Sequence, residues 1–479
     1  MYLTVKKATK IGKKDALILL IDDIDALDNN YFSKELSEYI KIQYLENDKK
    51  IVSVNSISQT IHVFINEKQK EPHVQMEKCR IAAAKINHIL NDNKIVDAGL
   101  LDLLSVKDDS IAFLEGFLLA NYQFIKYFTD FVKKENSISS LKLISENITD
   151  EDLSELKTIA NAVYICRDIV NEPVCNLNAE GFAKQAEALG KEVHIKTEVL
   201  NKSKLEALKM GGLLAVNKGS VEPPTFTIME WKPENAVNKK PIVLVGKGIV
   251  YDTGGINIKT AQGMADMKSD MAGAAAVASV MYAIAKSKLP VYIIGLMPAT
   301  ENRPNGNAYV PGDIITMFDG TQVEVQNTDA EGRMILADAL AYAKKYKPQL
   351  VIDIATLTGA ANAAIGKFGI PAMQSGAEKE MSNLKKSGNH VYERLVEFPL
   401  WEEYKELIIS DIADIKNIGG AQAGAISAGK FLEHFTDYPY IHLDVAGPAW
   451  ADKAENYKSK GGTGVGIRLL YNFIKSKSL

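Results

Sequence analysis

The fold class follows from the stretch PIVLVGKGIVYDTGG, residues Pro241–Gly255 of this 479-residue chain. It begins with a continuous apolar run, Pro241–Val245, of the kind expected for a strand buried on both faces of a largely parallel sheet. Glycines, a lysine and an aspartate follow at once. Because ligands in open α/β sheets bind beyond the carboxyl ends of the strands, we expect a functional site among these residues.

The same pattern recurs after this stretch, in the C-terminal part of the chain. Val291–Leu296 and Gln349–Ile354 are further, nearly continuous apolar runs, and Ala272–Lys286 and Arg333–Tyr346 have helical character. The repeated order of strand, loop and helix predicts an α/β domain with a largely parallel central sheet flanked by helices.

Acidic and basic residues follow these strands or precede the next helix in three separate segments. They are Lys247, Asp252, Lys259, Asp270, Asp329, Glu331 and Arg333. Four carboxylates that converge in a partly desolvated cleft repel one another. Two divalent cations would balance their formal charge of about −4. Oxygen-rich ligation suits Mg or Mn, and Zn also binds carboxylates.

The alternative interpretation is that these acids only cap helices or form surface ion pairs. Asp270 and Asp329 do lie near predicted helix starts, where the helix dipole stabilises acids. That interpretation accounts for single residues, but not for the whole set at strand ends beside glycines. Asp329 and Glu331 are two positions apart, so a regular helix would separate them. We therefore expect a kinked loop, made possible by Gly332, to direct both toward the metals.

The first 147 residues are predicted to form a smaller α/β domain without a cluster of catalytic residue types. Its strands are expected at Ala16–Ile21, Ile51–Val54 and Thr60–Ile65, and its helices over Met76–Leu90 and Ile111–Phe128. A chain of this length is too long for one ordinary core, which favours two domains.

A helix is expected to link the two domains. Thr149 and Asp152 have the spacing of a capping box, and Pro173 ends the helix because the residue before a proline avoids helical geometry. The predicted organisation is therefore 1–147 for the N-terminal domain, 148–172 for the linker helix and 173–479 for the catalytic domain.

Composition excludes several classes of protein. The net charge of −4 argues against nucleic acid as the main partner, and no apolar run approaches the roughly 18 residues of a membrane span. The three cysteines, Cys79, Cys166 and Cys175, lack CxxC spacing, so a reducing compartment is the simpler interpretation. The chain is predicted to be cytoplasmic.

Several motifs in the C-terminal part point to one family. The string NTDAEGR, Asn327–Arg333, resembles the signature of the leucyl aminopeptidase family of cytosolic two-metal exopeptidases, and VGKGIVYDTGGINIK, Val245–Lys259, resembles its metal-binding segment. The similarity continues in DMKSDMAGAAAV (Asp266–Val277), IDIATLTGA (Ile352–Ala360) and HLDVAG (His442–Gly447). It covers roughly residues 165–479, whereas the N-terminal part agrees with the family only in length and α/β character.

The resemblance implies a binuclear site that uses no histidine. Its metal ligands would be Lys247, Asp252, Asp270, Asp329 and Glu331. Lys247 would bind as a neutral amine, and Lys259 would stay charged and polarise the scissile carbonyl. Arg333 would hold a bicarbonate ion that acts as the general base. Two divalent ions, Zn or Mn with Mg possible, would activate the attacking water.

The resemblance also implies the substrate and the assembly. The first side-chain pocket would be lined by Met267, Thr356, Gly359, Ala446 and Ala449, with Asn327 and Leu357 receiving substrate backbone groups. These small and apolar residues predict release of N-terminal residues of leucine or methionine size from peptides. The family assembles as a homohexamer. A DNA-binding or regulatory role on the same fold is the alternative, and the chain offers no long basic run to support it.

Overall fold

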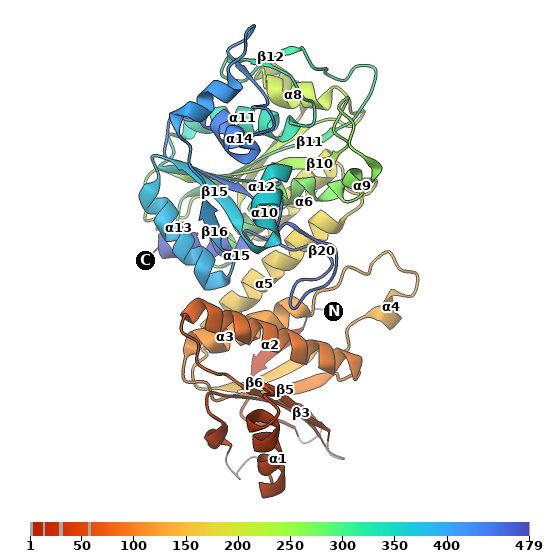
Figure 1. Cartoon of the computed structure of the whole chain (residues 1–479), viewed down its shortest axis with the longest axis vertical. Helices are drawn as coiled ribbons and strands as arrows, with labels where there is room; N and C mark the ends of the chain where they lie inside the picture. The colour runs from red at the N-terminus through yellow and green to blue at the C-terminus, as the bar shows by residue number, and fades with distance from the viewer. Residues whose placement is uncertain (1–2, 13–14, 28–31, 56–58, 479) are drawn as a thin grey trace. The chain divides into compact units, whose positions relative to one another are not determined.

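A computed structural model describes residues 3–12, 15–27, 32–55 and 59–478 of the chain (Figure 1). The chain divides into two compact units. The smaller one consists of Met1–Asn161 with Lys453–Lys460, and the larger one of Ala162–Asp452 with Gly461–Leu479. Both units combine strands with helices, which confirms the predicted α/β fold class.

Within the described residues the smaller unit holds a six-stranded sheet that is parallel except at one edge. In spatial order its strands are β1 (Thr4–Lys7), β6 (Ser140–Ser145), β5 (Asp97–Asp102), β2 (Ala16–Ile21), β4 (Thr60–Ile65) and β3 (Ile51–Asn55), with β3 antiparallel to β4. The three strands predicted in this region are confirmed.

Two long helices, α2 (Pro72–Asp92) and α3 (Lys107–Ala120), pack against each other beside this sheet. Their backbones approach closely at Gly116, where an added Cβ would lie 2.4 Å from the Arg80 carbonyl oxygen. The prediction that the second helix extends to Phe128 is wrong. The helix ends at Ala120, and the carbonyl of Asn121 accepts from Asn136 Nδ2 at 3.1 Å instead of from a further helical N–H, although aromatic residues at helical spacing continue beyond it.

The expected linker helix is one continuous element, α5 (Asp150–Asn171). The predicted capping box is present, because Thr149 N donates to Asp152 Oδ2 at 2.8 Å and Asp152 N donates to Thr149 Oγ1 at 3.1 Å. The division into units falls inside this helix, after Asn161. The segment Lys453–Lys460, expected in the larger domain, instead belongs to the smaller unit.

The larger unit is built on a sheet that is parallel in its centre and antiparallel toward its edges. Among the described residues it has nine strands, in the order β16 (Leu395–Glu397), β15 (Ile370–Ser375), β18 (Tyr440–Asp444), β14 (Leu350–Ala355), β9 (Ile242–Gly246), β11 (Ile293–Asn302), β8 (Thr225–Trp231) and β7 (Lys196–Leu200), with β10 (Gly248–Asp252) beside β11. The three predicted strands correspond to β9, β11 and β14, which are buried along their whole length.

Helices cover both faces of this sheet (Figure 1). One layer contains α6 (Ala179–Glu192), α10 (Ala272–Lys286), α13 (Glu378–Val391) and α15 (Ile467–Ser476). The other contains α8 (Gly211–Asn217), α11 (Glu331–Ala343) and α14 (Gly424–Glu433). No helix in the described part of the chain combines the length and apolar character that a membrane crossing needs.

One buried acid in α11 makes the stability of the larger unit depend on pH. Asp338 is fully buried, and its two carboxylate oxygens accept backbone N–H groups from Leu213 and Phe318, each at 2.9 Å. Burial raises the pKa of Asp338 from 3.8 to about 7, although the backbone hydrogen bonds oppose that change. The folded protein therefore holds this proton more tightly than the unfolded chain does.

We expect the contribution of Asp338 to stability to be largest below its unfolded pKa and to fall as the pH rises toward about 7. Raising the pH from about 5 to about 8 should lower the free energy of unfolding by roughly 2–3 kcal/mol through this group. Asp338→Asn, which cannot titrate, should lack this part of the pH dependence. Urea denaturation of both proteins at the two pH values measures it, and an identical pH dependence would contradict the assignment.

Candidate metal centre

The segment after β9 brings a lysine and an aspartate to the carboxyl edge of the sheet. Lys247 lies between β9 and β10, and its backbone is fixed because its N–H donates to Ile354 O at 3.1 Å and its carbonyl accepts from Ala274 N at 2.8 Å. Asp252 ends β10. Both side chains are buried.

Asp270 comes from the short 3₁₀ helix η2 (Met267–Met271), which precedes α10. Lys247 Nζ lies 2.8 Å from the Asp270 carboxylate and 3.0 Å from Glu331 Oε1. The same ammonium group donates to Thr356 O at 2.9 Å. Lys247 thus joins three segments that are distant in the sequence.

Asp329 and Glu331 reach the site because only Glu331 is part of the helix. Asp329 lies in the loop ahead of α11, where its N–H donates to Asn327 Oδ1 at 2.8 Å. The prediction that Gly332 provides a kink is wrong, since Gly332 lies within α11 and its φ is not positive. Gly332 instead leaves room for Lys247, whose Cε would lie 2.3 Å from an added Cβ.

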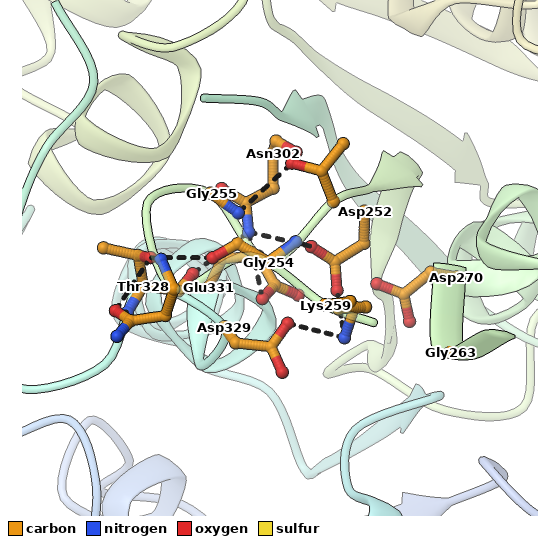
Figure 2. A network of polar contacts seen from close by, with 12 residues as sticks. Asp252, Gly254, Gly255, Lys259, Gly263, Asp270, Asn302, Thr328, Asp329 and Glu331 are labelled. Carbon is orange, nitrogen blue, oxygen red and sulfur yellow. Dashed lines mark hydrogen bonds and ion pairs between the residues drawn. The ribbon is translucent and has the colours of Figure 1, made fainter. Parts of the chain in front are cut away.

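The carboxylates of Asp252, Asp329 and Glu331 meet closely. Each offers an oxygen, and these oxygens all lie within 4.8 Å of one another. Lys259 lies between two of these acids, with its Nζ 2.9 Å from Asp252 Oδ2 and 2.5 Å from Asp329 Oδ1 (Figure 2). With Asp270, the cluster contains four acids held by two lysines.

The charges of the cluster are unbalanced. Four carboxylates and two ammonium groups sum to a formal charge of about −2. Burial and the neighbouring Glu331 raise the pKa of Asp252 to about 6, and burial raises the pKa of Asp270 well above its usual value. Burial alone would lower the pKa of Lys247, but Asp270 and Glu331 outweigh it and raise that pKa. Hard carboxylate oxygens from three buried acids and the exposed Asp329 make up the donor set that divalent cations prefer.

Arg333 lies in the first turn of α11, shortly after Glu331 in the sequence, and it is also buried. Its Nη1 donates to Asn417 O at 2.8 Å, and its guanidinium lies over the ring of Phe431 at 5.9 Å. Its Nε is buried and has no hydrogen-bond partner among the described residues. Burial lowers the pKa of Arg333 to about 10. The Nε–H group of this buried cation lacks an acceptor in the described part of the chain, and a small anion could supply one.

Hydrogen bonds connect only some of the residues that are expected to form the substrate pocket. Thr356 Oγ1 donates to Asp270 Oδ1 at 2.8 Å, so Thr356 lies at the cluster. Leu357 N and Ala446 N both donate to Asp444 Oδ1 at 3.1 Å, so their loops meet. The remaining positions lie on nearby segments: Met267 begins η2, Asn327 precedes α11, Gly359 begins α12 (Gly359–Ile365) and Ala449 follows β18.

The sequence prediction missed several polar residues that brace the site. Thr328 Oγ1 donates to Gly254 O at 2.7 Å, and Thr328 N donates to Asn257 Oδ1 at 2.8 Å. Asn417 orients the loop before α11 by donating to Asn327 O at 2.7 Å. Asn257 and Thr328 lie inside the motifs Val245–Lys259 and Asn327–Arg333, so these motifs could have suggested them. Asn417 lies outside these motifs.

The three cysteines differ in exposure. Cys79, Cys166 and Cys175 are all free, and the first two are buried. Burial raises the pKa of both buried thiols, which keeps them protonated.

Comparison with known proteins identifies the family. The model described as "Cytosol aminopeptidase family, catalytic domain" matches residues 164–471, which is more than half of the chain. This chain belongs to the cytosol aminopeptidase family. The predicted resemblance to the leucyl aminopeptidases is confirmed, and the protein is a metal-dependent aminopeptidase, a peptide hydrolase.

Relatives of this aminopeptidase cover most of the chain. A probable cytosol aminopeptidase of Chlorobaculum parvum is 48% identical over 370 residues, which are 74% of this chain and 73% of the relative. One of Chloroherpeton thalassium is 42% identical over 430 residues, 84% of each chain.

Two solved structures share the fold of this aminopeptidase over nearly its whole length. A mutant of tomato leucine aminopeptidase has a TM-score of 0.85 and 25% identity, covering 99% of this chain and 96% of its own. The bottromycin maturation enzyme BotP in complex with Mn has a TM-score of 0.86 and 26% identity, covering 97% of this chain and 100% of its own.

Proposed function

We propose that this aminopeptidase holds two divalent metal ions per subunit and releases single residues of leucine or methionine size from the N-termini of peptides. The observation that carries the proposal is the cluster of four acids, three of them buried, whose negative charge the two lysines only partly neutralise. The proposed ligands are Lys247, Asp252, Asp270, Asp329 and Glu331. Zn or Mn is proposed, with Mg also compatible with the oxygen-rich set.

The bound ions would supply a water of lowered pKa and anchors for the substrate's free α-amine and carbonyl oxygen. Lys259 is proposed to donate a hydrogen bond to that carbonyl oxygen as negative charge develops on it. Its position supports this role, because it is partly exposed at the cluster while Lys247 is buried. Both neighbouring acids keep Lys259 charged, raising its pKa despite burial.

Arg333 is proposed to hold bicarbonate, which would accept a proton during the reaction. The unpartnered Nε of this buried side chain supports the assignment, since an anion would supply the missing acceptor. Thr356, with Met267, Gly359, Ala446 and Ala449, is proposed to line the first side-chain pocket, and Asn327 and Leu357 to bind the substrate backbone. The small side chains in this set would leave room for an unbranched or γ-branched apolar residue.

A homohexamer in the cytoplasm is proposed for the assembly and its location. The hexamer rests on the resemblance to the leucyl aminopeptidases. The location is supported by the names of the relatives, which are called cytosol aminopeptidases. A DNA-binding role on the same fold is not favoured, because the chain has a net charge of −4.

We expect the protein, stripped with EDTA and reloaded with Mn or Zn, to hydrolyse leucine p-nitroanilide and Leu-Gly but not their N-acetylated forms. Acetylation removes the free amine that the metal site is proposed to bind. Hydrolysis of the acetylated peptide at an equal rate would exclude an exopeptidase that requires this amine. Removal of bicarbonate from the assay should lower the rate, and an unchanged rate would refute the role of Arg333.

A further inference from the structure

The strand β11, which lies beside the cluster of acids, ends in a buried asparagine. Asn302 is the last residue of β11 and is fully buried. Its carbonyl oxygen accepts Thr253 N at 3.0 Å and Thr253 Oγ1 at 2.8 Å. Thr253 directly follows Asp252, so these bonds fix the end of β11 to the segment that carries the first acid of the cluster.

The side chain of Asn302 reaches from this segment to the next one. Its Nδ2 donates to Asp252 Oδ1 at 2.8 Å, to Thr328 O at 3.0 Å and to Glu331 Oε2 at 3.4 Å (Figure 2). Asp252 and Glu331 belong to β10 and to α11, two elements that reach the site from different parts of the chain. One amide group therefore connects two of the proposed metal ligands.

The two oxygens of each acid have different partners. In Asp252, Oδ1 faces Asn302 and Oδ2 faces Lys259. In Glu331, Oε2 faces Asn302 and Oε1 faces Lys247. The amide thus orients each carboxylate through one oxygen and leaves the other oxygen directed at a cationic group.

The amide is suited to this position because it donates hydrogen bonds without carrying a charge. A lysine there would cancel part of the negative charge that attracts cations, and an aspartate would add repulsion between buried carboxylates. Outer partners that orient metal ligands raise the affinity for the metal. The Asn302 amide has both the contacts and the neutrality that such a partner needs.

We propose that Asn302 is a positioning residue that holds Asp252 and Glu331 in the arrangement a divalent metal requires. The proposal rests on the proposed function of these acids as ligands. In this role Asn302 acts through the two carboxylates that it orients.

The test measures Mn²⁺ binding to the full-length protein by competition with a fluorescent chelator, for wild type, Asn302→Leu and Asn302→Ser. Leucine has the same branched arrangement of heavy atoms as asparagine, is bulkier and has no hydrogen-bond donor, whereas serine is small and keeps one donor. Both variants are expected to bind Mn²⁺ about 10–100-fold more weakly. Their kcat for leucine p-nitroanilide should recover at saturating Mn²⁺, which a general loss of structure would not allow.

Two reference variants separate the possible outcomes. Asn217→Leu removes another buried amide, one that donates to Glu222 O at 2.8 Å and to Thr300 Oγ1 at 3.1 Å without touching an acid of the cluster, and it should bind Mn²⁺ as wild type does. Asp252→Asn should lose Mn²⁺ binding. Wild-type affinity in the Asn302 variants, or equal weakening in Asn217→Leu, would overturn the positioning role alone. Wild-type affinity in Asp252→Asn as well would overturn the proposed metal site itself.

Discussion

Replacing Glu331 by glutamine is expected to lower the Mn-dependent kcat/KM by more than about 10²-fold, since loss of an outer-shell partner alone costs roughly 10–100-fold. Glu331 is buried, lies 3.0 Å from Lys247 and shares the close oxygen cluster with Asp252 and Asp329. Glutamine keeps the shape of the side chain but removes its charge. It also replaces one oxygen, which a cation can bind, by an NH₂ group, which a cation repels.

The measurement is peptidase activity over a range of Mn²⁺ concentrations, together with the rise in Tm that Mn²⁺ produces. Both should be nearly absent in Glu331→Gln, because a ligand stabilises a protein only as far as it binds the folded state. Glu301→Gln is the matched control. Glu301 is also buried, but it accepts from Ser220 and pairs with Arg303. Wild-type activity in Glu331→Gln would remove this residue from the metal site.

The central strands and the acids of this site could be predicted because both depend on local sequence. A strand buried on both faces is mostly apolar, so β9 stands out as a continuous apolar run and β14 as one that only Asp353 interrupts. The ends of parallel strands share one edge, so acids after these runs were expected to meet there. Asp252, Asp329 and Glu331 do meet, within 4.8 Å.

Asn302 could not be predicted by the same reasoning. The apolar part of β11 ends near Leu296, yet the strand continues through a proline and polar residues to Asn302. It continues because β10 pairs with that half of it, from Ala299 to Asn302. This pairing depends on the position of β10 in the folded chain, which the pattern of apolar residues along the sequence does not show. Asn417 was missed for the same reason, since it meets Asn327 across 90 positions of sequence.

Gly332 shows a different limit of sequence reasoning. A glycine beside two acids suggested a kink, because glycine adopts conformations that other residues avoid. The structure instead uses its missing side chain, since the hydrocarbon stem of Lys247 occupies the place where a Cβ would be. The sequence marks the position as special, but only the packing of Lys247 against α11 shows which property of glycine is needed.

The two lysines of the cluster are proposed to have different tasks, and Lys259→Met tests the difference. We expect this variant to lose about 10²–10³-fold in kcat at saturating Mn²⁺, the usual cost of removing one donor to a developing oxyanion. We also expect it to bind Mn²⁺ more tightly than wild type, by roughly tenfold or more, because a nearby positive charge that opposed the cation is gone. Methionine has a similar length and no charge.

The tighter binding follows from the contacts of Lys259 in the structure. Its ammonium group lies on Asp252 and Asp329, two of the three acids whose oxygens cluster, and a cation must compete with it for them. A merely structural role for Lys259 predicts that activity and metal affinity fall together. The opposite signs expected here therefore separate the two explanations, with kcat measured by peptide hydrolysis and affinity by chelator competition.

Lys430→Met provides the matched control for this variant. Lys430 is buried on α14 and pairs with two acids, Glu402 and Glu433, each at 2.7 Å. Its loss should lower stability while leaving kcat and Mn²⁺ affinity close to wild type. If Lys259→Met instead kept its kcat, the carbonyl would have to be polarised by another group. If it bound Mn²⁺ more weakly, Lys259 would help to organise the acids rather than compete for their oxygens.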